Sequence, residues 1–409
     1  MFFTTDRNLF STLRVQRHVD RTSASSVYQL SNRHAWNYTT CLSIATTWLE
    51  KTRKTMHRVS ENSPWWAFAW EFPKKIRQAV EKLLAGMHHF EPLKSYAFDD
   101  EVVLTWDYQD RFALHLLWQI IRPVAKHIIP ERSYHLHKGT RQCLQDVQQM
   151  LDRQSFGFFM RLDVKSYYAS INHRILLEQL NSHFCDPVLQ HYFEQIVNVP
   201  INQNAQIINP THGIPRRSTL SPFFGAIYLM PLLKALQAQK GIECFLFMDD
   251  LLVLIKTKRQ YRRAKKLLFT LLDQLQLKLS AHKSKMGTLS DFHFLGIQFC
   301  VSQNHNAKNP NSQVSTQLHA RSCNRALDKV KAMTSDAVHP AHRQSYLSKW
   351  SAWWGTIFKQ IPISHAMTRY VAHAFALQEL SHAWLGRGLL SQRFASYFPR
   401  AVRQLESLL

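Results

Sequence analysis

Two adjacent carboxylates, Asp249 and Asp250, stand inside an otherwise apolar, strand-forming stretch at residues 244–255. This composition favours two strands joined by a tight turn, with the acids at the tip of the hairpin. Burying apolar surface around two acids raises their pKa values and costs folding energy unless a cation compensates. Magnesium suits such a place because it takes one or two carboxylates and completes its shell with phosphates and water. An acidic hairpin turn without a metal is the structural alternative.

A third acid, Asp163, ends a second apolar stretch at residues 158–163, which is typical of a buried strand. Between the two acidic strands the chain is mostly helical at residues 173–199, turns at 211–215, and then enters a strongly apolar helix. That helix opens with Ser221-Pro222, and proline near the first helical position loses no hydrogen bond. The acids are therefore placed at the ends of strands, with helices between them.

The flanking segments are expected to be helical on both sides of this region. Helices are predicted at residues 37–58, 73–84, 110–129, 141–151 and 260–279, with a short strand at 293–299. Ser63-Pro64 is expected to stop the first helix, and residues 133–139 are expected to form a loop. The His135/His137 pair in that loop lacks further ligands at zinc-site spacing, so a plain loop pair is favoured over a metal site. The N-terminal 40 residues and the polar stretch 302–312 show little periodicity.

An aromatic cluster follows Ser63-Pro64 and admits two interpretations. Aromatic side chains can stack on nucleic-acid bases, or they can pack a small satellite core. We favour packing, because burial of apolar surface is the commoner use of such residues. The cluster consists of Trp65, Trp66, Phe68, Trp70 and Phe72.

Composition points to a polyanionic partner. The 409 residues include 51 Lys plus Arg against 28 Asp plus Glu, a formal net charge of +23. Such an imbalance destabilises a compact chain by self-repulsion, so nucleic acid is the leading partner class and an anionic membrane surface the alternative. Against the membrane, no apolar run reaches 18 residues. The start lacks the pattern of a signal peptide, and six cysteines without a C-x-x-C pair favour reduced thiols in a cytoplasmic protein.

Four motifs, taken in their order along the chain, resemble the palm of reverse transcriptases, specifically the bacterial class that includes group II intron, retron and defence-associated enzymes. The sequence FMDD at residues 247–250 corresponds to the YxDD box of that family, and RLDVKSYYASI at 161–171 to its D-x-K-x-x-F/Y box. GIPRRSTLSPFFGAIYL at 213–229 corresponds to GIPQGxxxSPxxxNxxL. LKLSAHKSK at 277–285, followed by FHFLGIQF at 292–299, is similar to the late lysine box and the primer-grip strand.

The resemblance covers roughly residues 110–299 and implies an α+β fold, the right-hand polymerase with fingers, palm and helical thumb. On this basis we expect a basic, largely helical extension at 1–90, fingers at 91–157 and a palm at 158–300. The palm would contain a finger insertion at about 173–212. A linker at 301–317 and a helical thumb or C-terminal region at 318–409 would follow.

The resemblance also implies a site with two Mg²⁺ ions, for which Mn²⁺ could substitute. Asp163 and Asp249 would bridge both ions, Asp250 would support them or contact one, and the main-chain carbonyl of Val164 would complete one shell. Nucleotidyl transfer needs such a pair of ions about 3.5–4 Å apart. Tyr168 matches the aromatic steric gate that excludes a ribose 2′-hydroxyl and so implies a DNA product. A core tyrosine is the structural alternative.

Two departures from the family pattern concern charge. Arg216 and Arg217 stand where the family usually has Gln-Gly, and the finger strand at residues 100–106 lacks the usual cations. Our hypothesis is that one of these arginines replaces the missing positive charge at the incoming triphosphate. The other interpretation is that both arginines brace the template strand, since phosphate contacts of either kind use the same side chain.

Further roles implied by the resemblance are less specific. Lys283 could protonate the leaving pyrophosphate or be a solvated turn lysine, and Asp110-Arg111 is expected to form a structural ion pair. The primer grip would be Phe294, Leu295 and Gly296. Nucleic-acid contacts are expected after residue 318 at Arg321, Arg325, Lys329, Lys331, Arg343 and Lys349.

The expected function is RNA-directed DNA synthesis, extending a 3′-hydroxyl with dNTPs. The partners would be an RNA template, nascent DNA and dNTPs, without a membrane, and a homo-oligomer or second protein stays open. Antiphage defence with a dedicated noncoding RNA is favoured, because paired cysteines and histidines of an intron-type endonuclease do not follow residue 300. The alternatives are a group II intron-type or diversity-generating reverse transcriptase, template-independent or protein-primed synthesis, and a non-catalytic RNA-binding palm. The three acids argue against the last of these.

Overall fold

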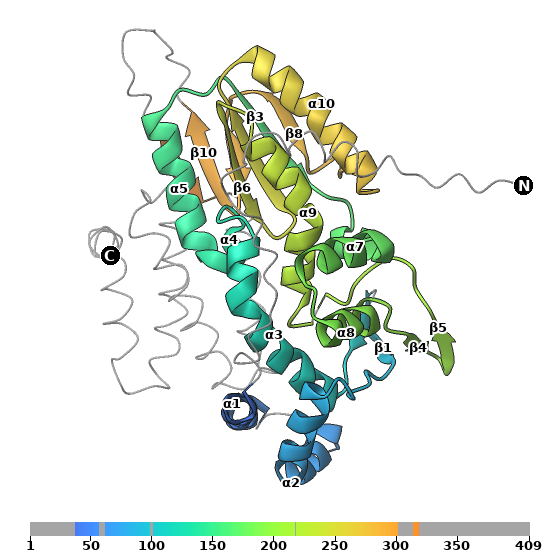
Figure 1. Ribbon diagram of the computed structural model, residues 1–409. Helices are drawn as coiled ribbons and strands as arrows, with labels where there is room; N and C mark the ends of the chain where they lie inside the picture. Colours follow the sequence, from blue (N-terminus) through green and yellow to red (C-terminus); the bar gives the residue numbers. More distant parts are fainter. Residues whose placement is uncertain (1–36, 57–61, 99–100, 217, 302–313, 319–409) are drawn as a thin grey trace, which may run out of the picture. The chain divides into compact units, whose positions relative to one another are not determined.

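The computed structural model describes residues 37–56, 62–98, 101–216, 218–301 and 314–318 (Figure 1). Three sheets form, with the strand orders β2-β1-β4-β5, β6-β7-β3-β8 and β11-β10-β9. The chain divides into two compact units. The first contains the described residues up to His137 together with Leu162–Leu251 and Arg262–Ser284; the second contains Lys138–Arg161, Leu252–Tyr261 and the described residues from Lys285 on. The predicted α+β class is confirmed.

The first unit holds most of the helices. They are α1 (Tyr38–Met56), α2 (Pro64–Leu84), α3 (Tyr108–Ile128), α4 (Tyr134–His137), α6 (Tyr167–Ser170), α7 (His173–His183), α8 (Pro187–Val197) and α9 (Ser221–Gln237). Helix α10 (Lys258–Gln274) begins in the second unit and continues in the first. It ends five residues before the predicted boundary, where Gln276 adopts a left-handed backbone conformation.

A finger-like sheet is built from two hairpins of the first unit. Strand β1 (Leu93–Phe98) pairs antiparallel with β2 (Glu101–Thr105) and parallel with β4 (Ile201–Gln203). Strand β5 (Gln206–Ile208) closes the second hairpin against β4. Lys94 on β1 contacts Asp107 at 3.5 Å, so the hairpin carries a cation, but that cation is already paired with an acid.

Helix α9 lies at the centre of the first unit. It packs against α7 and runs beside β6 (Ile242–Phe247) (Figure 1). Twelve of its 17 residues are buried, as expected for a helix that is apolar all round. Strand β7 (Asp250–Ile255) follows β6 after a two-residue turn, and residues 251–255 are all buried. The predicted acid-tipped hairpin and the apolar helix before it are both present.

The second unit contains α5 (Gly139–Arg153), the first part of β3 (Phe158–Asp163), β8 (Lys285–Thr288), β9 (Phe292–Phe294), β10 (Ile297–Val301) and β11 (Val314–Leu318). Stacked rings join its sheets: Phe292 lies 5.3 Å from Phe159 and 5.0 Å from Phe299, centroid to centroid. The prediction of one strand at 293–299 is wrong. Leu295 and Gly296 both have positive φ, 48° and 85°, and turn the chain into a β9–β10 hairpin.

The N-terminal aromatic cluster is mostly core, as favoured. Trp65 and Phe72 are buried, and Phe68 stacks on Phe72 at 4.5 Å. Trp66 and Trp70 are instead exposed, at 44% and 75%. The predicted start of this helix at residue 73 is wrong.

Helix α2 begins at Pro64 because the Ser63 hydroxyl caps it by accepting the Trp65 N–H, and proline occupies the first helical position. The sequence at Ser63-Pro64 was therefore a start signal where we expected a stop. None of the described helices is long and apolar enough to cross a membrane.

Candidate active site

Asp163 is fixed by backbone and hydroxyl contacts at the end of β3. The Ser280 N–H donates to the Asp163 carbonyl at 2.9 Å, and the Lys165 N–H donates to the Lys278 carbonyl at 2.8 Å. The Ser284 hydroxyl accepts the Asp163 N–H at 3.2 Å and lies 3.3 Å from its carbonyl. Because these two backbone bonds use the Asp163 carbonyl and the Lys165 amide, they leave the Val164 carbonyl outside this ladder.

Asp249 occupies the turn between β6 and β7, directly after Met248, whose φ is 57°. Burial raises the pKa of the Asp249 carboxyl; its own N–H lowers that pKa, and the neighbouring Asp163 charge raises it further. Lys283 and Arg216 are close enough to lower it in part. The structure thus brings Asp163 and Asp249, 86 positions apart in the chain, into electrostatic range of each other. Asp250 follows as the first residue of β7.

Two tyrosines of helix α6 lie beside this acid pair. Tyr167 is fully enclosed, and its hydroxyl donates to the Gly225 carbonyl on α9 at 2.5 Å. Burial and the charge of Asp249 raise the pKa of Tyr168 to about 12, partly opposed by Arg216. The Tyr168 ring is therefore near Asp249 and stays protonated. A Cβ on Gly225 would lie 3.2 Å from the Tyr167 ring and 3.5 Å from the Tyr168 ring, so this glycine makes room for both.

A pocket of about 580 Å³ opens next to Tyr168 within the first unit. Its walls come from β1 and β2, from residues 197–201 and from residues 210–216, together with Ala169. Gly213 approaches Ala169 so closely that a Cβ would lie 3.3 Å from the Ala169 backbone, and its φ is +90°. The Ile214 N–H donates to the Tyr168 carbonyl at 2.8 Å. The pocket wall is thereby tied to the tyrosine helix.

His135 contacts the acid-bearing turn, which sequence reasoning did not anticipate. Its Nδ1 accepts the Met248 N–H at 3.0 Å, and its Nε2 lies 3.2 Å from the Pro222 carbonyl at the start of α9. Burial lowers the pKa of His135 to about 4, so the ring is neutral at physiological pH. The expectation of a plain loop at 133–139 is also wrong, because residues 134–137 form the short helix α4.

The oxygen donors present fit a hard divalent cation. Among the described residues, no three His, Cys, Asp or Glu side chains gather closely enough to hold a metal by themselves. Asp163 and Asp249 supply two carboxylates, which is the number Mg²⁺ usually takes before substrate phosphates and water complete its shell. Asp249 is half-buried, and burial raises the pKa of its carboxyl, which Lys283 and Arg216 offset only in part.

Of the other residues predicted for the site, Lys283 lies beside Asp163, the primer-grip residues lie in the second unit, and the rest fall outside the described residues. Lys283 is 64% exposed, and its Nζ is 3.5 Å from an Asp163 oxygen. Phe294 ends β9, and Leu295 and Gly296 form the turn of the β9–β10 hairpin in the second unit. Outside the described residues lie Arg217, Arg321, Arg325, Lys329, Lys331, Arg343 and Lys349.

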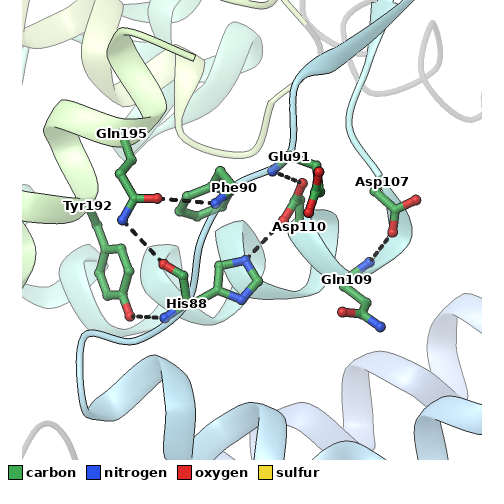
Figure 2. A network of polar contacts seen from close by, with 8 residues as sticks. All are labelled: His88, Phe90, Glu91, Asp107, Gln109, Asp110, Tyr192 and Gln195. Atoms are coloured by element: carbon green, nitrogen blue, oxygen red, sulfur yellow. Dashed lines mark hydrogen bonds and ion pairs between the residues drawn. The ribbon is translucent and has the colours of Figure 1, made fainter. Parts of the chain in front are cut away.

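The predicted Asp110–Arg111 ion pair is wrong. Asp110 is buried and accepts hydrogen bonds from the Glu91 N–H at 3.1 Å and from His88, whose Nε2 is 2.9 Å away (Figure 2). Arg111 instead donates from Nε to the Trp106 carbonyl and lies over the Tyr108 ring. Adjacent residues on a helix point in different directions, so the two side chains find separate partners.

An acid-tipped strand and an acid-tipped hairpin, covered by helices and joined to a finger-like sheet, define a polymerase palm with fingers. Residues 103–299 match the family described as "Reverse transcriptase (RNA-dependent DNA polymerase)". The chain therefore carries a reverse transcriptase domain. Enzymes of this family are nucleotidyltransferases, and they generally depend on divalent metal ions.

Two solved structures show a partial likeness to this chain. They are titled "Partial Cas6-RT-Cas1--Cas2 complex" and "Cas6-RT-Cas1--Cas2 complex"; both are 18% identical over 56% of this chain, with a TM-score of 0.35. The likeness covers 40% of the first chain and 25% of the second, so this chain spans less than half of either. No curated protein matches the sequence.

Sequence reasoning missed three residues that contact the site: Ser284, Gly225 and His135. Ser284 lies within the late lysine motif, and Gly225 within the apolar helix, so both were in segments already singled out. Their roles depend on a partner far along the chain, Asp163 for the first and Tyr167 for the second. The only available signal was a glycine inside a buried helix, which often marks close packing.

Proposed function

We propose that this chain is an RNA-directed DNA polymerase that extends a 3′-hydroxyl with dNTPs, using Mg²⁺. The observation that carries the proposal is the pairing of Asp163 with Asp249, next to Tyr168, inside a matched reverse transcriptase domain. Burial raises the pKa of the Asp249 carboxyl, and a divalent cation shared with the Asp163 carboxylate would lower the electrostatic energy there. The site residues predicted from the sequence otherwise stay proposals.

The roles follow from position. Asp163, Asp249 and the Val164 carbonyl would hold the metal ions, with Asp250 supporting them. When bound, such ions lower the pKa of the attacking hydroxyl and offset charge on the leaving pyrophosphate. Lys283, exposed beside Asp163, would contact a phosphate or donate a proton to the leaving group. Tyr168 would pack under the sugar and exclude a 2′-hydroxyl.

The pocket beside Tyr168 supports a place for the base pair being formed. Most of its lining residues are apolar, including Val103, Leu104 and Ile214, and Arg216 is among the polar ones. Flat aromatic bases suit such walls, while the guanidinium suits a phosphate oxygen. We therefore propose that Arg216 contacts the incoming triphosphate, in place of the cations that strand β2 lacks.

The charge at Arg216 can be tested by kinetics. Arg216→Ala should raise KM for dNTP with a smaller change in kcat, whereas Arg216→Lys should recover part of the loss because it keeps the charge but not the forked donor. An unchanged KM would instead favour the template-brace interpretation. Arg217→Ala serves as the comparison at the neighbouring position.

The cellular role we propose is antiphage defence with a dedicated noncoding RNA as template, working in the cytosol without a membrane. The departures at Arg216 and Arg217 and in the finger strand support a lineage that diverges from intron-type enzymes. Cys41, Cys185 and Cys244 are free thiols, which supports a reducing compartment.

Sequencing the RNA and DNA that copurify with the wild type, beside an Asp249→Ala Asp250→Ala control, tests both levels. DNA copied from one defined RNA, absent in the control, supports both the activity and the dedicated template. DNA copied from many RNAs supports the activity alone. Bound RNA with no new DNA in either sample points to the non-catalytic RNA-binding alternative.

A further inference from the structure

The turn that carries Asp249 has an uncommon backbone. Met248 has φ 57°, a left-handed conformation that a residue with a long side chain rarely adopts. Such a residue costs of order 1–3 kcal/mol and persists where surrounding contacts hold it. Because Met248 immediately precedes Asp249, any relaxation of this torsion would redirect the carboxylate.

A contact from a distant segment holds this torsion. The Met248 N–H donates to Nδ1 of His135 at 3.0 Å, which requires Nδ1 to be the unprotonated nitrogen. Nε2 then carries the hydrogen and donates to the Pro222 carbonyl at 3.2 Å. The imidazole also meets the Phe247 ring edge to face, with centroids 6.0 Å apart. One side chain thus joins the β6–β7 turn to the start of α9.

The segment before His135 is aligned with β6 so that it delivers the ring to this turn. Ser133 forms a parallel bridge with Leu246, and the Leu246 N–H donates to the Arg132 carbonyl at 2.9 Å. Counting two residues onward along both parallel segments reaches His135 and Met248. Further contacts fix this register: Arg132 donates to Glu243 at 3.1 Å, and the Tyr134 and Phe245 rings stack 6.1 Å apart.

We propose that His135 is a positioning residue, which holds the Met248 backbone and thereby aims the Asp249 carboxylate at the metal ions. The inference rests on the proposed function, since it assigns a purpose to the fixed turn. Its role is fulfilled by Nδ1 as an acceptor. The Nε2 contact to Pro222 orients the ring and is secondary.

Two variants test the roles of the two ring nitrogens of His135 separately. Asn in place of His135 puts an amide oxygen near the position of Nδ1 and can still accept the Met248 N–H, but it does not reach Pro222. Gln in place of His135 can reach the Pro222 carbonyl with its amide nitrogen, but it leaves no acceptor at the Nδ1 position. His137→Gln is the matched control, because His137 lies on the same short helix and its Nε2 lies 3.1 Å from the Ile129 carbonyl, away from the Met248 turn.

Three measurements on the full chain decide the proposal: hydrogen exchange in the peptide spanning Met248, Mn²⁺ affinity by electron paramagnetic resonance, and primer extension. For His135→Gln we expect faster exchange at Met248, and Mn²⁺ affinity and kcat each lower by about 10- to 100-fold. KM for dNTP should change less than kcat. His135→Asn and His137→Gln should stay close to wild type in all three.

The outcomes distinguish this proposal from the proposed function. Wild-type exchange and Mn²⁺ affinity in His135→Gln would overturn the role of His135, whether or not the wild type polymerises. Equal losses in His135→Asn and His135→Gln would overturn the assignment to Nδ1. An inactive wild type in which only His135→Gln loses Met248 protection and Mn²⁺ affinity would support the positioning of Asp249 and count against the polymerase.

Discussion

Asp110 and Asp249 are both aspartates withdrawn from water in the same compact unit, and burial raises the pKa of each. Their surroundings differ. Asp110 receives a backbone N–H and an imidazole, one on each oxygen (Figure 2). Among the described residues, Asp249 receives a hydrogen bond from its own N–H and faces a second acid, Asp163, whose effect on its pKa is opposed in part by Lys283 and Arg216.

The difference teaches how to tell a structural acid from a functional one. A buried carboxylate with its hydrogen bonds made contributes to the fold, whereas one left beside a like charge is retained for a cation that binds later. The contrast between Asp110 and Asp249 therefore predicts opposite effects of mutation on stability and on activity.

The largest expected effect is loss of activity in Asp249→Asn. Because metal ions supply several kcal/mol of transition-state stabilisation, primer extension should fall by about 10³-fold or more. In EDTA the variant should melt at the wild-type temperature or above, since a repulsive charge is gone. Mg²⁺ should raise Tm of the wild type only. Calorimetry and a primer-extension assay check both, and an active variant would break the comparison.

The next effect is loss of stability in Asp110→Ala. It leaves the Glu91 N–H and His88 without their acceptor, so the free energy of unfolding should fall by roughly 2–4 kcal/mol. Turnover per folded molecule should stay near wild type. Asp107→Ala is the matched control: it removes the cap that accepts the Gln109 N–H at 3.1 Å on the same helix and should cost about 1 kcal/mol. Urea unfolding measures both variants; equal losses would contradict the prediction.

Sugar selection gives a smaller effect. Tyr168→Ala should reduce discrimination of dNTP against rNTP by about 10- to 200-fold, the range for a lost packing contact in a pocket. Tyr168→Phe keeps the ring and should discriminate like wild type. The ratio of kcat/KM for matched dATP and rATP is the measurement. Unchanged discrimination in Tyr168→Ala would return this residue to the core-tyrosine interpretation.

The smallest effect concerns pH in the absence of metal. The folded-state pKa of Asp249 is raised above the ordinary value of 3.8, so the folded state favours the protonated acid. Its contribution to stability is therefore present at low pH and is lost as pH rises from about 3.8 through the raised pKa. In EDTA, wild-type Tm should drop relative to Asp249→Asn across this window. A constant difference would argue against a strained acid.

Local patterns predicted the elements that carry the acids. The apolar strand ending at Asp163, the apolar helix after Ser221 and the hairpin around Asp249 each depend on periodicity and turn chemistry within a short window, and all three are present. The predictions for the start of α2 and for a single strand at 293–299 were wrong. Each outcome depends on one residue, a helix cap in the first case and a residue with positive φ in the second. Ser63 caps the start of α2 where we expected the preceding helix to end, and Leu295 adopts a positive φ although it is not a glycine.

The contacts around the site could not be predicted from short stretches of sequence. His135 finds its partners 113 and 87 positions away, at Met248 and Pro222, and Ser284 meets Asp163 121 positions away. The residues next to His135 in the sequence give no indication of such distant partners. Motif resemblance located the acids themselves, since it draws on the order of several segments at once.

The close approach of Gly213 to Ala169, with the bond from the Ile214 amide to the Tyr168 carbonyl, has a consequence for copying accuracy. If bases pair in the neighbouring pocket and Tyr168 packs under the sugar, as we propose, a misfitting base pair that pushes on residues 213–215 would also displace the Tyr168 ring. The same group of residues would then respond to a mispaired base and to a ribose in place of deoxyribose. A substitution that lowers selectivity for the base pair should therefore also lower selectivity for the sugar.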